Sequence, residues 1–243
     1  MLAASRSAWL DWGWISRNGD LIWTSLREHL VLTALAVFWG LVVAIPLAVA
    51  ARRWRWLYPP VLSLGGILYT IPSLAAYALL IPYTGLSRTT ALIPLASYTL
   101  LILVRNIVTG LDGVPAAARE SAVAMGFNDR QRMWRVEVPL ALPAMLAGVR
   151  LATVSTVGLV TVAGLVGFDN LGQFIYLRGF RDGRRTAIVV GTVLIVAVAV
   201  LADLALVGLE RLATPWKRRL DGGAEGDAVA SEAVVTVVQY EGV

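Results

Sequence analysis

A polar segment at about residues 111–142 lies between two strongly apolar stretches and carries closely spaced signals for helix starts and ends. It contains residues 119–126 (RESAVAMG), followed after nine residues by residues 136–139 (VEVP). Pro115 suits the first turn of a helix, and Gly126 suits a left-handed helix end. These signals predict a short helix that stops at the glycine.

A second short helix is expected directly after Gly126. Asn128 with Gln131 three residues later resembles a capping box, and Pro139 and Pro143 are expected to end this helix before the next apolar stretch. The alternative is an amphipathic linker that rests on lipid headgroups. Its basic and apolar residues would be Arg130, Arg132, Met133, Trp134 and Arg135.

Several other kinds of chemistry are not supported by the residue types. Cysteine is absent, which excludes disulfides and thiolate sites. The single histidine, His29, lacks partners for a metal site and is expected to be an interfacial anchor. No Gly-x-x-x-x-Gly-Lys-Ser/Thr loop is present, so this sequence lacks the common phosphate-binding loop of nucleotide-binding proteins. We expect no covalent catalysis and no metal site on this chain.

Composition indicates that the chain folds in a lipid bilayer. Hydrophobic residues make up 58% of the sequence, charged residues only 15%, and the mean hydropathy is +0.71. These values are typical of polytopic membrane proteins. We expect an all-α fold with five transmembrane helices, because five stretches are long enough to cross roughly 30 Å of hydrocarbon. They are residues 29–51, 60–82, 89–110, 143–166 and 187–209.

Charge distribution suggests an orientation. The formal net charge of +5 comes from arginine clusters beside apolar stretches, which does not indicate nucleic-acid binding. Clusters at residues 52–55, in the polar segment and at residues 211–219 fall on one side, expected to be the cytoplasm. The N-terminus is then outside and the C-terminus inside. The opposite side nevertheless also contains Arg178, Arg181, Arg184 and Arg185.

The chain is expected to comprise three parts. Residues 1–28, rich in tryptophan, are expected to lie along the membrane interface. Residues 29–212 are expected to form the transmembrane domain, with the polar segment at about 111–142. Residues 213–243 form a cytoplasmic tail that is expected to be disordered, because it cannot bury enough apolar surface to fold alone.

Polar and aromatic residues within the second apolar stretch suggest a solute pathway. Pro72 is expected to interrupt the helix near mid-bilayer. Tyr69, Ser73 and Tyr77 are spaced by four, so they would share one helical face. Tyrosine faces favour quaternary ammonium groups. Ordinary aromatic packing between helices is the alternative.

Three ionisable residues lie within the apolar stretches. Arg105, Arg150 and Asp203 are each expected roughly 8–10 Å inside the same edge of the membrane. Because unpaired charges at that depth are costly, we expect Asp203 to pair with Arg150 or Arg105. Alternatively, both arginines reach the headgroups and Asp203 faces a wet crevice.

The polar segment resembles the EAA loop of binding-protein-dependent ABC importer permeases. Glutamate, two small residues, a glycine six residues after the glutamate and a proline thirteen further on follow that pattern, with Ser121 replacing the usual first alanine. The resemblance implies a coupling helix that enters a cleft of a cytoplasmic ATPase. The implied docking residues are Glu120, Ser121, Ala122, Gly126 and Pro139.

A wider resemblance, over approximately residues 29–210, is to the permeases of osmoprotectant importers. It is carried by residues 69–74 (YTIPSL), 79–82 (LLIP), 105–106 (RN), 109–110 (TG), 139–143 (PLALP) and 147–150 (AGVR). It implies a permease with the methionine-importer-type fold in a prokaryotic inner membrane, and a cargo of the glycine betaine, choline, carnitine and proline class.

The same resemblance implies the partners. They are a second permease copy or paralogue, a pair of ATPase subunits that hold ATP and magnesium, an external solute-binding protein and membrane lipid. One departure is the turn at residues 167–172 (GFDNLG), which keeps the outer glycines of a glycine-rich turn and loses the inner ones. Asn170 is expected to preserve it because asparagine tolerates unusual backbone angles.

Three rival functions stay open at this stage. The cargo could be a polar amino acid or methionine rather than an osmoprotectant. The chain could be a secondary transporter with Asp203 as the coupling acid, although inverted repeats are not evident. A non-transporting membrane scaffold would need neither the broken helix nor the docking loop.

Overall fold

The computed structural model describes residues 9–216, and every regular element in that range is a helix. The all-α prediction is therefore confirmed for this part of the chain. The described residues fall into two units, which divide between residues 206 and 207 within the last helix. In the second unit the described residues are the end of the last helix and a few residues after it. The predicted disordered tail lies almost wholly outside the described residues.

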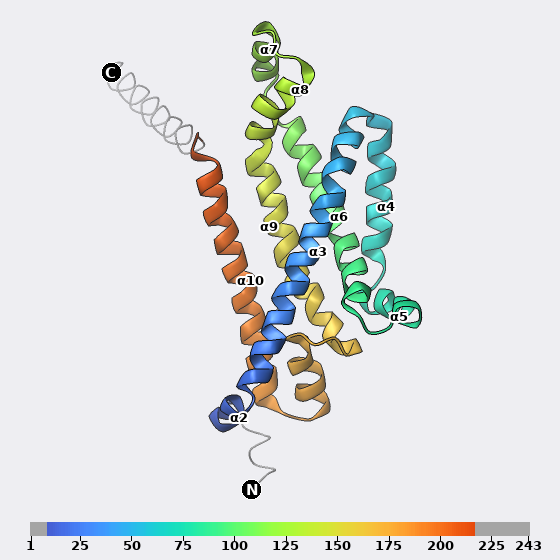
Figure 1. The fold of residues 1–243 in the computed structure, drawn as a ribbon, viewed down its shortest axis with the longest axis vertical. Coiled ribbons are helices and arrows are strands. Elements are labelled where there is room, and N and C mark those ends of the chain that lie inside the picture. The colour runs from blue at the N-terminus through green and yellow to red at the C-terminus, as the bar shows by residue number, and fades with distance from the viewer. Residues whose placement is uncertain (1–8, 217–243) are drawn as a thin grey trace, which may run out of the picture. The chain divides into compact units, whose positions relative to one another are not determined.

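Three long helices form the centre of the first unit: α3 (Gly19–Arg53), α6 (Arg88–Asp112) and α9 (Val138–Ala163) (Figure 1). Glycines allow them to approach closely. A Cβ atom added to Gly40 of α3 would lie 1.8 Å from Thr99 Oγ1 of α6. A Cβ atom on Gly148 of α9 would lie 2.4 Å from Asn106 Cβ of α6. Small residues at helix contacts are the usual means of packing in membranes.

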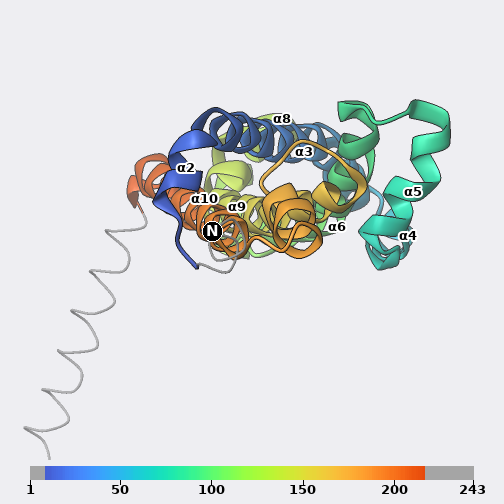
Figure 2. The same cartoon turned by 90° about the horizontal axis from the view of Figure 1, so that it is seen from below.

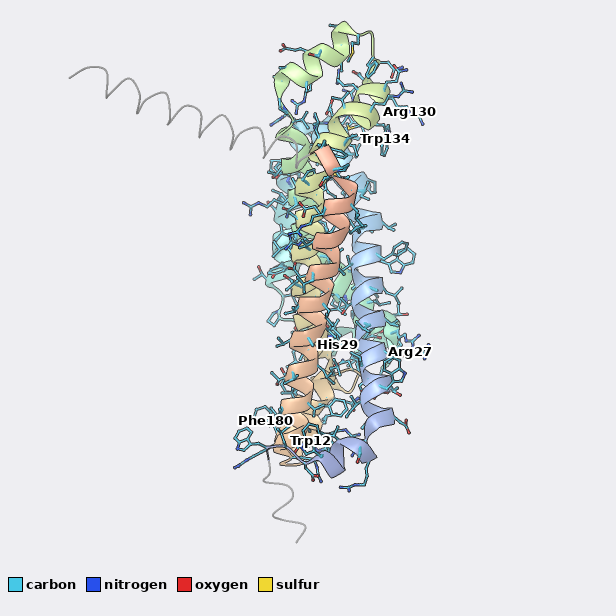
Figure 3. All side chains as sticks on the ribbon, turned by 90° about the vertical axis from the view of Figure 1, so that its left-hand side faces the viewer. Trp12, Arg27, His29, Arg130, Trp134 and Phe180 are labelled. Carbon is cyan, nitrogen blue, oxygen red and sulfur yellow. The ribbon has the colours of Figure 1, made fainter. Side chains whose placement is uncertain are left out.

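Helix α3 begins earlier than hydropathy predicts. It starts at Gly19, so the expected boundary between residues 28 and 29 falls inside a continuous helix. His29 is fully buried, with Nε2 3.2 Å from the carbonyl oxygen of Val157 on α9 (Figure 3). The interfacial role predicted for His29 is therefore wrong, because the extra turns of α3 place the histidine inside the helix bundle.

A short helix, α2 (Trp12–Arg17), precedes α3. Asp11 caps it by accepting a hydrogen bond of 2.9 Å from the backbone N–H of Trp14. Trp14 is buried and its ring packs edge-on against Phe174, whereas Trp12 is exposed. The tryptophan-rich segment therefore has one packed face and one open face.

The second predicted span is broken into two helices. A 3₁₀ turn, η1 (Arg55–Leu57), leads into α4 (Tyr58–Thr70), and α5 (Ser73–Thr84) follows after two residues. The two parts of the span are bent by 87°. Figure 2 shows both helices to one side of α3 and α6. The break predicted at Pro72 is confirmed.

The number of membrane spans is four or five by length and composition. Four helical stretches qualify alone, and the bent pair of α4 and α5 makes a fifth if it is counted as one span. The stretches that qualify alone are Gly19–Arg53, Arg88–Asp112, Asp129–Val166 and Arg185–Ala213. The last of these is helix α10. A 3₁₀ turn, η3 (Gly164–Val166), and a π-helical segment, η4 (Phe174–Arg181), connect α9 to α10.

Candidate functional site

The polar segment, residues 111–142, folds into two short helices around a glycine turn. Helix α7 (Ala116–Ala124) ends at Gly126, whose φ is +81°. The N–H of Gly126 donates to the carbonyl of Val123 at 2.9 Å, and the N–H of Phe127 donates to that of Ala122 at 3.0 Å. This pair of bonds is a Schellman motif, which requires a left-handed residue at the glycine position. The prediction of a helix end at Gly126 is confirmed.

The second helix, α8 (Asp129–Arg132), begins with the predicted capping box. The side chain of Asn128 accepts from the N–H of Gln131 at 2.9 Å, and Gln131 Oε1 accepts from the N–H of Asn128 at 3.0 Å. Pro115 lies one position before α7 as its N-cap, rather than within its first turn.

The prolines do not end this second helix, contrary to the prediction. The chain continues from α8 through a π-helical turn, η2 (Met133–Glu137), into α9. Pro139 lies at the start of α9, directly after the π-helical turn, so the helix continues through a residue that has no N–H to donate. Pro143 lies within α9. The polar segment is therefore continuous with a membrane-spanning helix.

The docking candidates differ in exposure. Glu120, Ser121 and Gly126 are exposed, and Pro139 is partly buried. Ala122 has no exposed surface, so its side chain lies on the inward face of α7. A Cβ atom added to Gly126 would meet no other atom within 4 Å, so this turn is open to a partner.

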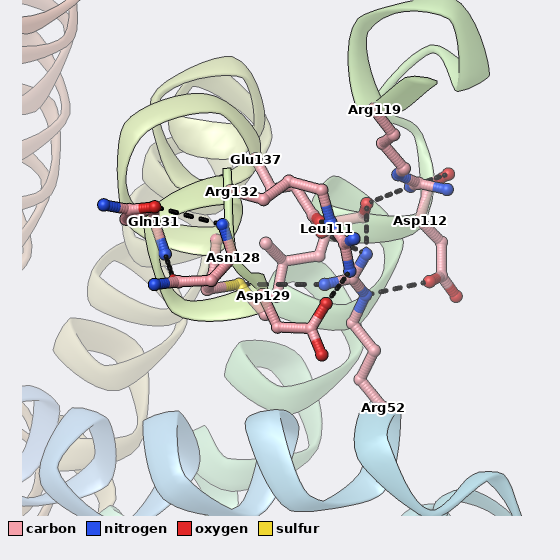
Figure 4. Close-up of polar contacts among 10 residues, drawn as sticks. Arg52, Leu111, Asp112, Arg119, Asn128, Asp129, Gln131, Arg132 and Glu137 are labelled. Atoms are coloured by element: carbon pink, nitrogen blue, oxygen red, sulfur yellow. Dashed lines mark hydrogen bonds and ion pairs between the residues drawn. The ribbon is translucent and has the colours of Figure 1, made fainter. Parts of the chain in front are cut away.

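An ionic cluster that sequence reasoning missed joins the polar segment to α3 and α6 (Figure 4). Glu137, at the end of η2, is only 1% exposed. Arg132 Nε donates to Glu137 Oε1 at 2.8 Å, and Arg52 at the end of α3 forms an ion pair with the other carboxylate oxygen. Arg52 Nε also lies 3.4 Å from Asp112 Oδ1 at the end of α6. We call these four residues the charge cluster.

Further hydrogen bonds tie the segment to the end of α6. Arg119 of α7 donates to the backbone carbonyls of Leu111 and Asp112, at 2.8 and 3.2 Å. Arg52 donates to the same carbonyl of Leu111 at 3.5 Å. Side-chain contacts therefore connect α7 and α8 to the ends of both α3 and α6.

The tyrosines predicted to share a helical face do not do so. Tyr69 ends α4 and is exposed, whereas Tyr77 lies on α5 and is fully buried against Phe168. The bend between α4 and α5 separates them. Tyr98, which the sequence analysis missed, packs edge-on against Tyr69, with ring centroids 6.0 Å apart. Its hydroxyl donates to the carbonyl of Ile71 at 2.9 Å and so satisfies a backbone group at the break.

The ion pair predicted for Asp203 is present. Arg150 Nε donates to Asp203 Oδ1 at 2.9 Å, and Nη2 donates to Oδ2 at 3.1 Å. This bidentate pair joins α9 to α10 beside a mainly apolar cavity of about 500 Å³. Arg105 is exposed on α6, so the partner of Asp203 is Arg150 rather than Arg105.

The turn at residues 167–172 is preserved by a different mechanism from the one predicted. Gly167 adopts the left-handed conformation, with φ of +97°. Asn170 does not have a positive φ; instead its buried Oδ1 accepts from the N–H of Gly172 at 2.7 Å. Within residues 9–216 no cluster of histidine or carboxylate side chains could hold a metal ion.

Comparison with known proteins gives one consistent result. Residues 36–214 match the family of binding-protein-dependent transport system inner membrane components. The glycine betaine/carnitine/choline transport system permease protein OpuCB of Bacillus subtilis (strain 168) is 33% identical over 201 residues, which is 83% of this chain and 92% of that protein. The osmoprotectant import permease protein OsmW of Salmonella typhimurium is 35% identical over 193 residues, covering 77% of this chain and 89% of that protein.

Solved structures show the same architecture. An inward-facing structure of the MetNI methionine ABC transporter contains a chain with a TM-score of 0.72 and 25% identity. The match covers 80% of this chain and 96% of that chain. A chain from an amino acid ABC transporter has a TM-score of 0.66 at 19% identity, which shows the fold alone.

Proposed function

Because the chain belongs to the family of binding-protein-dependent transport system inner membrane components, we propose that it is the permease subunit of an ATP-driven importer for osmoprotectants. The relatives are permease subunits rather than enzymes, and ATP is hydrolysed on a separate subunit. The chain is a multi-pass inner-membrane protein that works with an ATPase and a second permease subunit.

The observation that carries this proposal is the construction of the polar segment. Its glycine turn and the carboxylate of Glu120 are exposed, while its base is fixed by the buried Glu137 to α3 and α6. A surface that is open at its tip and rigid at its base suits a coupling helix. We propose that Glu120, Ser121 and Gly126 contact the ATPase, with Ala122 and Pro139 shaping the segment from within.

Transport then follows from the mechanical connection. When the ATPase subunits close, they displace α7 and α8, and the charge cluster transmits this displacement to the cytoplasmic ends of α3 and α6. The Arg150–Asp203 pair keeps α10 in register with α9, which is continuous with α8. The helices thus move together, as alternating access requires.

The solute pathway is proposed to pass the break between α4 and α5. Tyr69 presents exposed aromatic surface there, beside Pro72 and Ser73, and the buried Tyr98 packs against it. Tyr77 supports the pathway by packing rather than by lining it. Aromatic faces suit the quaternary ammonium groups of betaine, choline and carnitine, the solutes for which the relatives are named.

The proposal also includes the membrane orientation, the domain bounds and the partners of the permease. The polar segment faces the cytoplasm, so five crossings place the N-terminus outside and the C-terminus inside. The transmembrane domain is taken as residues 29–212 and the tail as 213–243. The partners are an ATPase pair, a second copy or paralogue of this permease and an external solute-binding protein, in a lipid bilayer.

Uptake of radiolabelled glycine betaine by cells that express the complete gene cluster tests the cargo. We expect ATP-dependent uptake that excess choline or carnitine reduces and excess methionine does not. Competition by methionine or a polar amino acid alone would assign the chain to that other cargo class. The absence of any uptake from an assembled complex would refute the osmoprotectant assignment.

A further inference from the structure

A cluster of arginines lies at the end of the first unit opposite the polar segment. The positive-inside rule does not account for it, because this is the side proposed to be outside. Three of these arginines line a cavity of about 440 Å³. Its lining residues are Trp14, Arg178, Arg181, Asp182 and Arg184.

Aromatic rings hold two of the guanidinium groups in place. Arg184 lies over the ring of Trp14, 5.6 Å from its centroid, and Arg178 lies over the ring of Phe174 at 5.8 Å. Trp14 and Phe174 themselves pack edge to face, 6.2 Å apart. The result is a stack with a guanidinium at each end, joined by cation–π contacts. The backbone N–H of Arg184 also donates to the carbonyl of Arg178 at 3.2 Å, which fixes the spacing of the two residues.

The cavity has the charge and unused donors of an anion site. Three arginines against one aspartate leave its lining with an excess of two positive charges. Arg178 Nε is buried and has no hydrogen-bond partner among residues 9–216. A guanidinium fork matches phosphate oxygens in a bidentate manner. A phosphate group in this cavity would meet the guanidinium groups of the lining arginines and neutralise the excess charge.

Exposed aromatic side chains surround the same end of the unit. Trp12 is 73% exposed and Phe180 is 72% exposed, and Figure 3 shows both at this end. Such side chains concentrate at the headgroup level of a bilayer. A concave basic site bordered by interfacial aromatics favours a lipid over a protein surface. We propose that this cavity binds the phosphodiester of an anionic phospholipid and so anchors α2, η4 and the start of α10 at the membrane surface.

Native mass spectrometry of the assembled transporter in detergent micelles tests the proposal. The complex is titrated with phosphatidylglycerol, and lipid adducts are counted only on intact assemblies. We expect adducts on the wild type that weaken about tenfold in Arg178→Gln and Arg184→Gln, since each removes a charge-assisted contact to phosphate. Arg181→Gln should weaken them too. Arg181 lies outside the aromatic stack, so this variant remains informative if the other two fail to assemble.

Matched controls separate the possible sources of the anion. Arg17→Gln removes an exposed arginine of α2 that does not line the cavity, and it should leave the adducts unchanged. Phosphatidylcholine should bind more weakly than phosphatidylglycerol, and millimolar inorganic phosphate should not displace the lipid. Equal adducts on wild type and all three variants would overturn the proposal, as would displacement by free phosphate. So would variants that keep the lipid but lose docking of the solute-binding protein.

Discussion

Replacing Glu137 by glutamine tests whether the charge cluster fixes the polar segment to the long helices. The variant keeps the side-chain volume but removes the charge that faces Arg52 and Arg132. A hydrogen bond to a charged group contributes roughly 1.5–3 kcal/mol, which gives an upper limit for each arginine. Both arginines keep another acceptor, Asp112 for Arg52 and Asp129 for Arg132, and both are partly exposed. We therefore expect a total loss of about 2–3 kcal/mol.

The assay is thermal unfolding of the purified complex together with solute-stimulated ATP hydrolysis in proteoliposomes. A loss of this size should lower the midpoint by on the order of 5 °C. ATP hydrolysis should persist while transport per ATP falls, because the ATPase still closes but moves a loosened segment. Glu120→Gln is the matched control: this exposed carboxylate should leave the midpoint unchanged and weaken only retention of the ATPase. A Glu137→Gln complex with the midpoint and transport of the wild type would refute the mechanical role of the cluster.

Two further predictions concern the packing of the long helices. Exchanging the charges in Arg150→Asp/Asp203→Arg should restore part of the uptake lost in either single variant, measured as solute uptake by whole cells; a double variant no better than the singles would contradict a structural ion pair. Gly148→Ala should lower the unfolding midpoint because its Cβ atom would lie 2.4 Å from Asn106 Cβ, whereas Gly158→Ala on the same helix meets nothing within 4 Å and should be neutral or slightly stabilising. Equal midpoints for the two glycine variants would show that α6 and α9 do not pack as described.

Local signals in the sequence predicted the polar segment well. Gly126 and the pair Asn128 and Gln131 act on backbone groups within a few residues, so their effect can be predicted without knowing the fold. The break at Pro72 has the same local origin. The prolines at 139 and 143 misled the prediction because Pro139 stands at the start of α9, where proline is tolerated, and Pro143 is accommodated inside that helix, as prolines in membrane helices can be.

Long-range contacts could not be predicted in the same way. Glu137 forms an ion pair with Arg52, which is 85 positions earlier in the sequence. No sequence signal near either residue predicts that the two are partners. His29 is buried by α9, so its environment depends on a helix that begins more than a hundred residues later. The sequence limits the partners of Asp203 to Arg150 or Arg105, because depth in a membrane restricts the partners available to a buried charge, and the structure shows that the partner is Arg150. Hydropathy could not show the 87° bend that separates Tyr69 from Tyr77.

The central claim is that ATP hydrolysis on a partner drives transport through the exposed turn at Gly126. Its most direct test is ATP-dependent uptake of radiolabelled glycine betaine into proteoliposomes that contain the complete transporter. Gly126→Asp combines a strained positive φ with a bulky charge at the docking surface, and Gly158→Ala serves as the control. The account predicts that Gly126→Asp abolishes uptake while the permease still assembles in the membrane, and that the control transports normally. Normal uptake by Gly126→Asp would contradict the account.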